Sequence, residues 1–437
     1  MKQLSQKQVV IALGSAVLII GVLVLIFANL RRRGTGEQEF SLKVWGVDDR
    51  QIFTELIRNY KVLRSGAKVE YTQFDPANYG SALLNALASG EGPDVLYVGN
   101  RDLPRSLNRL YPVNPAQFNL VKLRELFPAV VEQDFVSASG SQIFALPIYL
   151  DTLALIYNRD FFDNAGIVAP PSTWDQFQAV IPKLRDVSPN GQIVHAAAAI
   201  GGSGKTVDAG EDLLALLMLQ NGTRMTNDDR TSASFAQQQG SVNPGASAFN
   251  FYLQFANPGS PYYTWNDGQP NSLESFIGGK TTMIFNYQSV IGEIKKKSPF
   301  LHFAVAPMPQ PTGSQIFVNL PKYYGLAVSK QSKAPGWAWD FVIYLTTNPQ
   351  IEKIYLDATG RPPALRGLIG EKLNDPNSGV FAKQALTARS WYEVDDAAVS
   401  RAMNDAITTV LSGQVDSLRA LRQAQDKVSQ LMTKNNL

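Results

Sequence analysis

The motif with the most obvious chemical potential is the glycine-rich turn Gly-Gly-Ser-Gly-Lys-Thr at residues 201–206, between two apolar segments. A phosphate-binding loop has another glycine separated from its Gly-Lys pair by four residues. Ala199 takes that place, so nucleotide binding is not predicted. A turn of this kind either lines a cleft through its backbone N–H groups or is only a tight turn, and the sequence leaves both possibilities open.

Residues suited to hydrolytic or metal chemistry are sparse. His195 and His302 lie within apolar, strand-like segments typical of packed histidines, and no Gly-x-Ser-x-Gly motif is present. The carboxylate pairs Asp48–Asp49 and Asp395–Asp396 do not establish the separation across a cleft that glycoside hydrolysis needs. The chain has no cysteine, which excludes disulfides, thiolate metal sites and a cysteine nucleophile. The sequence therefore predicts neither an enzyme nor a cofactor or metal.

Aromatic residues are abundant, with 22 Phe, 16 Tyr and 6 Trp. A pyranose packs its C–H faces on aromatic rings, and its hydroxyls bond to planar polar groups. Aromatic residues placed beside polar ones near strand ends therefore favour a carbohydrate ligand. The alternative for each ring is a place in the core, which we expect for Trp174, Trp337 and Trp339. The aromatic residues that stand beside a polar one near a strand end are Trp45 with Asp48, Tyr149 with Asp151, Tyr287 with Asn286, and Trp391 with Asp395.

The elements that position these residues alternate between strand and helix. Residues 41–100 read strand, helix, strand, helix, strand, which predicts an α/β lobe with a parallel sheet. The apolar segment 144–167 is extended enough to cross to a second lobe. Further strands are expected at 192–202, 281–286, 303–308 and 323–329, further helices at 170–187, 209–222 and 336–347, and two last helices broken at Gly413.

The net charge of +3 is concentrated at one end of the chain. Residues 1–36 carry five basic and no acidic side chains, whereas the rest carries 35 basic and 37 acidic ones. Because the main body is weakly acidic, nucleic-acid binding is not predicted. The apolar run at residues 9–30 gives about 33 Å of helix, enough to cross a bilayer, so we expect a transmembrane anchor with a tether to residue 36.

A cleaved signal peptide is the alternative for this run, although its length and lack of a small-x-small site favour the anchor. Charge alone leaves the orientation open, because Lys2 and Lys7 compete with Arg31–Arg33. Read strictly, the charge rule leans towards a cytoplasmic main body.

The order of segments after residue 40 resembles the extracellular solute-binding proteins of ABC importers, in particular the maltose-binding-protein-like group. This resemblance implies an α/β, two-lobe periplasmic-binding-protein-like (type II) fold with a ligand cleft between the lobes. It assigns residues 37–147 and about 322–360 to one lobe, and 148–321 and about 361–437 to the other. The segments that carry it are LKVWGV at 42–47, GEGPDVLYVGN at 90–100, 146–167 followed by PPSTWDQF at 170–177, GGKTTMIFNYQSVIGEI at 278–294, 337–347, 358–366 and 412–428.

The same resemblance, transferred motif by motif, implies ligand-binding residues at the ends of the predicted strands. Trp265 and Trp391 are added because of their aromatic and polar surroundings, whereas Arg361 is interpreted as locking a helix end. The implied residues are Asp48, Asp49, Arg50, Gly99, Asn100, Arg101, Tyr149, Asp151, Asn286 and Tyr287.

The resulting hypothesis is a membrane-tethered, extracytoplasmic substrate-binding protein that delivers a sugar or oligosaccharide to the permease subunits of an ABC transporter. Many proteins of this group are released by signal cleavage or held by a lipid on cysteine. Since this chain has no cysteine, a transmembrane tether is the expected substitute. The alternatives are a solute receptor or adhesin without a permease and, from another class, a membrane-anchored glycoside-processing enzyme. The sequence does not specify the solute, the permease or the oligomeric state.

Overall fold

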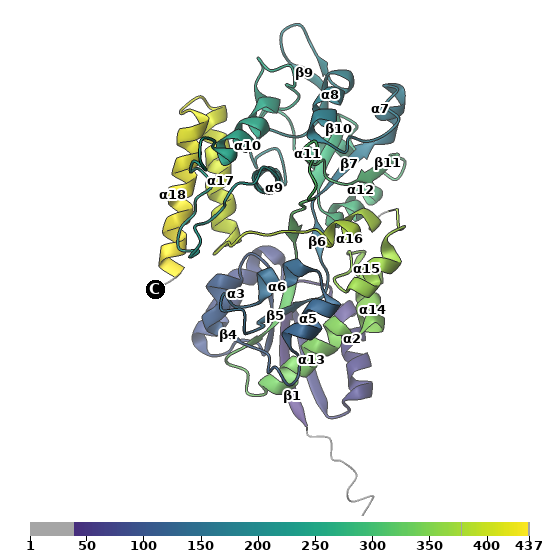
Figure 1. Cartoon of the computed structure of the whole chain (residues 1–437). Coiled ribbons are helices and arrows are strands. Elements are labelled where there is room, and N and C mark those ends of the chain that lie inside the picture. The colour runs from purple at the N-terminus through teal and green to yellow at the C-terminus, as the bar shows by residue number, and fades with distance from the viewer. Residues whose placement is uncertain (1–38, 377, 436–437) are drawn as a thin grey trace, which may run out of the picture.

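The computed structural model describes residues 39–376 and 378–435, which form two α/β bodies, one above the other in Figure 1. The body that contains the N-terminal strand is called lobe 1, and the other lobe 2. The predicted transmembrane run at residues 9–30 lies outside the described residues. Within the described ranges, no helix is long and apolar enough to cross a membrane.

Lobe 1 is built on a six-stranded sheet in the order β2-β1-β3-β13-β4, with β5 also paired to β13. Both β2 and β3 run parallel to β1, as the alternating pattern predicts, whereas β13 is antiparallel to β3, β4 and β5. The sheet is therefore mixed. Its strands are β1 (Phe40–Gly46), β2 (Ala67–Gln73), β3 (Val95–Gly99), β4 (Leu110–Tyr111), β5 (Ala145–Pro147) and β13 (Tyr324–Ser329).

Local sequence explains why the first helices of lobe 1 begin where they do. Asp49 caps α2 by accepting the backbone N–H of Gln51, and Asp75 caps α3 in the same way. Gly90 ends α3 in the left-handed conformation. The helices of lobe 1 are α2 (Arg50–Leu63), α3 (Pro76–Ser89), α4 (Leu103–Ser106), α5 (Leu120–Leu126), α6 (Ala129–Phe135), α13 (Pro335–Thr347), α14 (Pro349–Thr359) and α15 (Arg366–Lys372).

Lobe 2 has a five-stranded sheet in the order β11-β7-β10-β9-β8, in which β10 and β9 are parallel. Its strands are β7 (Ala154–Asn158), β8 (Asp186–Val187), β9 (Ile193–Ala198), β10 (Thr281–Asn286) and β11 (Phe303–Ala306). Its helices include the C-terminal pair α17 and α18 that lies along one flank of the lobe in Figure 1. They are α7 (Arg159–Asn164), α8 (Trp174–Leu184), α9 (Gly210–Gln220), α10 (Pro244–Leu253), α11 (Ser272–Ile277), α12 (Ile291–Lys297), α17 (Asp396–Leu411) and α18 (Ser417–Asn435).

The chain passes between the lobes through extended segments at their junction. Strand β6 (Asp151–Thr152) pairs with β12 (Pro321–Lys322), and residues 386–392 run alongside through the pairing of Asn319 with Ala388. Helix α16 (Gly379–Ala385) packs beside β6. The predicted crossing within residues 144–167 is therefore confirmed.

Two main hydrophobic cores support the two lobes. Buried residues from 40–150 and 323–388 form one cluster, and those from 153–320 and 391–432 form the other, with a smaller cluster beside it. The division at residues 360 and 361 implied by the resemblance stays a prediction. The packing favours a boundary nearer residue 389.

Candidate functional site

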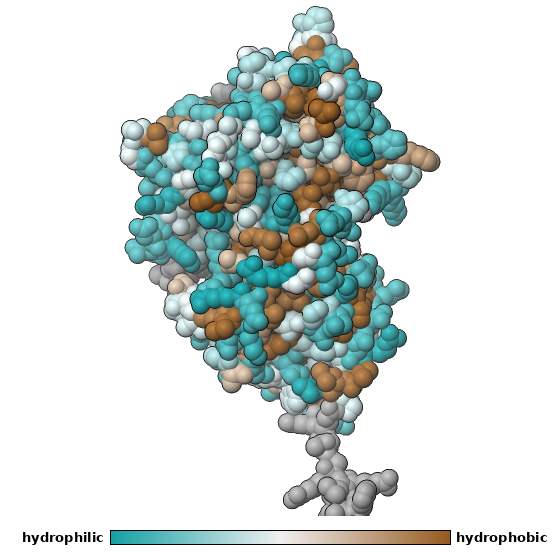
Figure 2. All heavy atoms as spheres, turned by 45° about the vertical axis from the view of Figure 1, so that its right-hand side comes forward, coloured by the Kyte–Doolittle hydropathy of each residue, from teal (hydrophilic) through white to brown (hydrophobic). Residues whose placement is uncertain are grey.

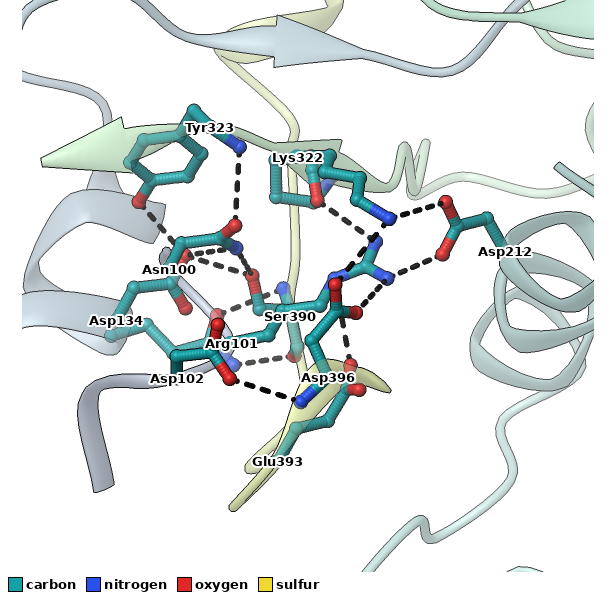
Figure 3. A network of polar contacts seen from close by, with 12 residues as sticks. Asn100, Arg101, Asp102, Asp134, Asp212, Lys322, Tyr323, Ser390, Glu393 and Asp396 are labelled. Carbon is teal, nitrogen blue, oxygen red and sulfur yellow. Dashed lines mark hydrogen bonds and ion pairs between the residues drawn. The ribbon is translucent and has the colours of Figure 1, made fainter. Parts of the chain in front are cut away.

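Arg101 is the centre of a charged network that joins the lobes (Figure 3). It follows β3 of lobe 1, and only 4% of it is exposed. Its guanidinium pairs with Asp212 in the first turn of α9 and lies 3.3 Å from Asp396 at the start of α17. It also donates to the carbonyl of Pro321 at 3.1 Å and lies 3.5 Å from Glu393. A lobe 1 cation is thus held by lobe 2 acids.

Lys322, on the crossing strand β12, supplies the second cation. Its Nζ lies 3.6 Å from Asp212 and 3.5 Å from Asp396. The hydroxyl of Tyr287 donates to Asp212 at 2.7 Å. Burial pushes the pKa of Asp212 upwards, but the charges of Arg101 and Lys322 outweigh it and hold that pKa below its usual range. Asp212 is therefore ionised at neutral pH.

Glu393 differs from the other acids of the network, because burial raises its pKa well above the usual range despite the opposing charge of Arg101. Arg101 and Lys322 each lie beside the carboxylates of Asp212 and Asp396, so each of these two cations has an acidic partner within the network.

A second cluster surrounds Asp48 at the end of β1. Its carboxylate accepts the hydroxyls of Tyr97 at 2.6 Å and Tyr355 at 2.8 Å, and pairs with Arg361 at 2.9 Å. The guanidinium of Arg361 lies 4.1 Å from the ring centroid of Tyr149, a cation–π contact. Arg361 therefore joins two of the predicted site residues, a larger role than locking a helix end.

Tyr324, at the start of β13, lies between the two clusters. Its ring centroid is 5.9 Å from that of Tyr97. Burial raises the pKa of Tyr324, as do Asp102 and Asp396, whereas Lys322 and Arg361 act in the opposite direction. We call the two clusters and Tyr324 together the interlobe polar surface. Its main members are Asp48, Arg101, Tyr149, Asp212, Tyr287, Lys322, Tyr324, Arg361 and Asp396.

The interlobe polar surface is partly open to solvent. The side chains of Lys322, Asp396 and Arg361 are 41%, 25% and 22% exposed. A pocket of about 310 Å3 opens beside Arg361, with Gln288 and Ser289 of lobe 2 on its opposite wall. The surface of the molecule is indented at the junction of the lobes (Figure 2).

Two other predicted residues fix the crossing strand to lobe 2. Asp151 accepts the backbone N–H groups of Thr152 at 2.8 Å and Gln288 at 3.1 Å, and burial raises its pKa to about 7. Asn286 accepts the N–H of Tyr287 at 2.8 Å. Both side chains therefore shape the backbone on which Tyr287 and Gln288 are presented.

Asn100 lies on the other side of the crossing strand. Its amide donates to Asp134 at 3.0 Å, and its oxygen accepts the N–H of Tyr323 at 3.1 Å. Asp134 also accepts the hydroxyls of Tyr323 at 2.8 Å and Ser390 at 2.9 Å, and burial raises its pKa to about 7. Asn100 therefore anchors the connections between the lobes.

Three predicted residues at the strand ends have mainly backbone roles in the structure. Asp49 is exposed and caps α2, and the N–H of Arg50 donates to Gln73 at 3.0 Å. At Gly99 an added Cβ would lie 3.1 Å from the carboxylate of Asp102. Whether Asp49, Arg50 or Gly99 contacts a ligand stays a prediction.

The two weaker predictions, Trp265 and Trp391, lie away from this surface. Trp265 is fully buried, with its indole N–H donated to Thr206 at 3.1 Å, so it presents no ring face to a ligand. Trp391 lines a different pocket, beside Asp134. The structure does not bring either ring into the interlobe polar surface.

The glycine-rich turn at 201–206 is held by an acid. Asp267 accepts the N–H of Ser203 at 2.8 Å, its hydroxyl at 2.7 Å, and the hydroxyl of Thr206 at 3.0 Å. The N–H of Gly204 donates to Asn404 at 2.7 Å, and Lys205 is exposed. Because a carboxylate occupies this turn, it is unsuited to a phosphate.

Sequence reasoning missed Asp212, Lys322, Tyr324 and Asp396 as members of the surface. Each stands at the first positions of a strand or helix, which is the only local signal that marks them. Their convergence depends on how the two lobes meet, which no segment of the sequence contains.

Comparison with known proteins identifies the family. The profile of the bacterial extracellular solute-binding protein family matches residues 46–352, more than half of the chain. The chain belongs to this family. Its members are binding proteins rather than enzymes, which agrees with the absence of a predicted catalytic motif.

Individual relatives are distant. The chain is 27% identical over 214 residues to a putative binding protein of Brucella abortus, 47% of this chain, and spans about half of that relative (48%). It is 25% identical over 338 residues to the maltotriose-binding protein of Pyrococcus abyssi, covering 75% of this chain and 65% of the relative. The sugar-binding protein MalE of Xanthomonas citri has the same fold, with a TM-score of 0.76, 20% identity, and coverage of 91% of this chain and 98% of MalE. The predicted two-lobe α/β fold is therefore confirmed.

Proposed function

We propose that this protein is an extracytoplasmic substrate-binding protein of an ABC importer, which captures a sugar or oligosaccharide between its lobes. The observation that carries the proposal is the interlobe polar surface. Lobe 1 contributes Arg101 and Arg361, lobe 2 contributes Asp212 and Tyr287, and Lys322 stands on the strand between them.

The chemistry of this surface supports an uncharged, hydroxyl-rich ligand. Arg361 and Asp396, whose side chains are partly exposed, offer planar, charge-assisted partners for hydroxyls. Tyr324, which is partly exposed, offers ring surface beside them, as sugar C–H faces require. Lys322 is already paired with Asp212 and Asp396, which favours a neutral ligand over an anion at this position. A maltotriose-binding protein and MalE among the similar proteins point to the same ligand class.

Capture of the ligand would involve bending of the segments that connect the two lobes. Closure of two lobes around a ligand is a recognised hinge motion, and β6, β12 and residues 386–392 are the segments that would bend. A ligand that contacts both lobes binds the closed arrangement better and shifts the population towards it. A permease that distinguishes the closed arrangement then receives loaded protein.

The attachment to the membrane is part of the same proposal. The apolar run at residues 9–30 is long enough to span a bilayer, and the chain has no cysteine for a lipid. Protease added to intact cells should remove the main body from the outside. Protection of the main body, with digestion only after the cells are opened, would refute this orientation.

A ligand screen tests the function. Purified protein should be melted with maltotriose, maltose, other oligosaccharides, monosaccharides, amino acids and short peptides. At a hundredfold excess over Kd, a ligand stabilises by about 2.7 kcal/mol, which raises the Tm by about 3 °C for a chain of this length. We expect such a shift with at least one carbohydrate. A shift with amino acids or peptides alone, or turnover of a chromogenic glycoside, would contradict the proposal.

A further inference from the structure

The end of lobe 1 at which β1 begins is the part of the described structure closest in sequence to the apolar run at residues 9–30. Strand β1 begins at Phe40, at the lower end of the molecule in Figure 1. Eight residues, 31–38, separate the apolar run from Glu39, the first described residue. Eight residues span at most about 30 Å when fully extended. A membrane anchor at residues 9–30 therefore keeps this end of lobe 1 within about 30 Å of the bilayer.

Two neighbouring hydrophobic side chains are exposed at this end. They are Val62, 86% exposed, and Leu63, 52% exposed, the last two residues of α2. The loop that follows them lies against the start of β1, because the N–H of Phe40 donates to the carbonyl of Gly66 at 3.3 Å. Hydrophobic side chains are visible at this end of the molecule in Figure 2. Exposed apolar side chains beside the entry of an anchored chain are suited to the headgroup region of a bilayer.

The end of α2 is fixed to its surroundings. The rings of Phe40 and Trp337 stack at 4.4 Å, and the guanidinium of Arg64 lies 5.7 Å from the ring centroid of Trp337. Arg64 also pairs with Asp340 at 2.9 Å, and the hydroxyl of Tyr60 donates to the same carboxylate at 2.8 Å. Contacts with β1 and α13 therefore hold the helix end, and the exposed apolar pair is presented on a rigid support.

Three exposed lysines lie at the same end of lobe 1. Lys61 is in the last turn of α2, and Lys330 and Lys333 are in the connection from β13 to α13. This connection reaches the same end because β13 is antiparallel to β3, which is parallel to β1. None of the three lysines has an ion pair among the described residues. Basic side chains of this kind are attracted to anionic lipid headgroups.

Most acids at this end are already engaged. Glu39 pairs with Lys68 at 2.7 Å, and Asp94 accepts the backbone N–H of Lys43 at 2.8 Å. Glu91 is exposed and has no ion pair among the described residues. Three lysines against this one acid leave an excess of positive charge around the apolar pair.

We propose that this end of lobe 1 rests on a bilayer with anionic headgroups, with Val62 and Leu63 in the headgroup region and the three lysines beside lipid phosphates. The proposal rests on the membrane attachment proposed above and not on the carbohydrate ligand. A short tether gives the contact a millimolar effective concentration, so a contact too weak to recruit a free protein is sufficient. We call this surface the membrane face, and its members are Lys61, Val62, Leu63, Lys330 and Lys333.

The test uses the full chain in nanodiscs of equal parts phosphatidylcholine and phosphatidylglycerol. Because the chain has no cysteine, Val62→Cys provides a single site for an environment-sensitive fluorophore. Val168→Cys is the matched control, since Val168 is fully exposed on lobe 2. Lipid that carries a nitroxide at its headgroup quenches a fluorophore that touches the bilayer. We expect strong quenching at position 62 and none at position 168.

Charge should control this contact. Each lysine near an anionic surface contributes roughly fivefold to the ratio of docked to undocked protein, so Lys61→Gln with Lys333→Gln should lower that ratio by roughly twentyfold. Lys183→Gln with Lys205→Gln makes the same change of charge at exposed positions of lobe 2 and should leave the quenching unchanged. Equal effects of the two lysine pairs, or equal quenching at positions 62 and 168, would overturn the proposal.

Flotation with vesicles of phosphatidylcholine alone separates the membrane face from the attachment itself. A chain that floats with these vesicles, but whose fluorophore at position 62 is not quenched in the anionic nanodiscs, would overturn the membrane face and leave the attachment standing. A chain that does not float would overturn both.

Discussion

The charged network makes a strong prediction about Arg101→Met, which removes the guanidinium and keeps much of the aliphatic volume. The side chains of Asp212 and Glu393 that Arg101 contacts are 2% and 3% exposed. Removing one partner of a buried pair leaves uncompensated charge and costs about 3–5 kcal/mol. Lys322 remains 3.6 Å from Asp212, so we expect the lower end of that range, about 3 kcal/mol.

The matched control is Arg105→Met on the same segment of lobe 1. Arg105 pairs with Asp395 at 2.8 Å and Asp102 at 3.1 Å, but its side chain is 38% exposed. Ion pairs that reach solvent contribute at most about 1 kcal/mol, so Arg105→Met should cost no more than that. The contrast between these variants isolates the effect of burial.

The cost of Arg101→Met should depend on pH in a definite direction. Because Arg101 helps to lower the pKa of Asp212 in the folded protein, their pairing stabilises above the unfolded pKa of aspartate, about 3.9. That stability is lost as the pH falls through the lowered pKa of Asp212. The free energy of unfolding should be measured by urea denaturation at pH 7.5 and pH 3.5. A cost no greater than that of Arg105→Met, or one that does not shrink at pH 3.5, would refute this reasoning.

Two further predictions concern other parts of the molecule. Burial raises the folded pKa of Asp134 to about 7, so wild-type stability should fall as the pH rises from about 4 to about 7. Asp134→Asn should remove the share of that fall that Asp134 causes, while Asp151, with a similarly raised pKa, keeps its own share. The variant should gain up to about 4 kcal/mol over the wild type between pH 5 and pH 8 in urea denaturation, and the same pH dependence in both proteins would contradict the assignment. At Gly201, φ is +93° and an added Cβ would lie 2.8 Å from the backbone nitrogen of Ala256, so Gly201→Ala should cost about 2 kcal/mol or more. Lys205 is exposed, so Lys205→Ala should change the free energy of unfolding by less than about 0.5 kcal/mol. Thermal melts of both variants test this, and a greater loss of Tm in Lys205→Ala than in Gly201→Ala would show that the turn depends on its lysine.

The fold was largely predictable, because short stretches of sequence specify most of its strands and helices. The strand and helix order of residues 41–100, the strand over 281–286 and the break at Gly413 all follow from apolar spacing and turn residues. The mixed character of the first sheet did not follow. Strand β13 enters beside β3 from a part of the chain more than 200 residues away, and no local pattern specifies its direction.

The site was predictable in part, for the same reason. The family resemblance, transferred motif by motif, indicated Asp48 and Arg101, and each of them holds a network together in the structure. Their partners come from distant segments of the chain. Arg361 meets Asp48 through the folding of lobe 1, whereas Asp212 meets Arg101 only where the two lobes join. Trp265 shows the converse, because an aromatic residue beside polar ones reads like a ligand platform although its ring is buried and bonded to Thr206.

The central claim is that a carbohydrate binds at the interlobe polar surface, and calorimetric titration of one variant pair tests it most directly. The carbohydrate that gives the largest Tm shift should be titrated into wild type, Lys322→Ala and Lys353→Ala. Lys322 stands at the centre of the surface, whereas Lys353 pairs with Glu371 on the exterior at 2.7 Å. We predict one ligand per chain, binding about tenfold weaker in Lys322→Ala and unchanged in Lys353→Ala. Equal affinity in all three proteins would contradict the account.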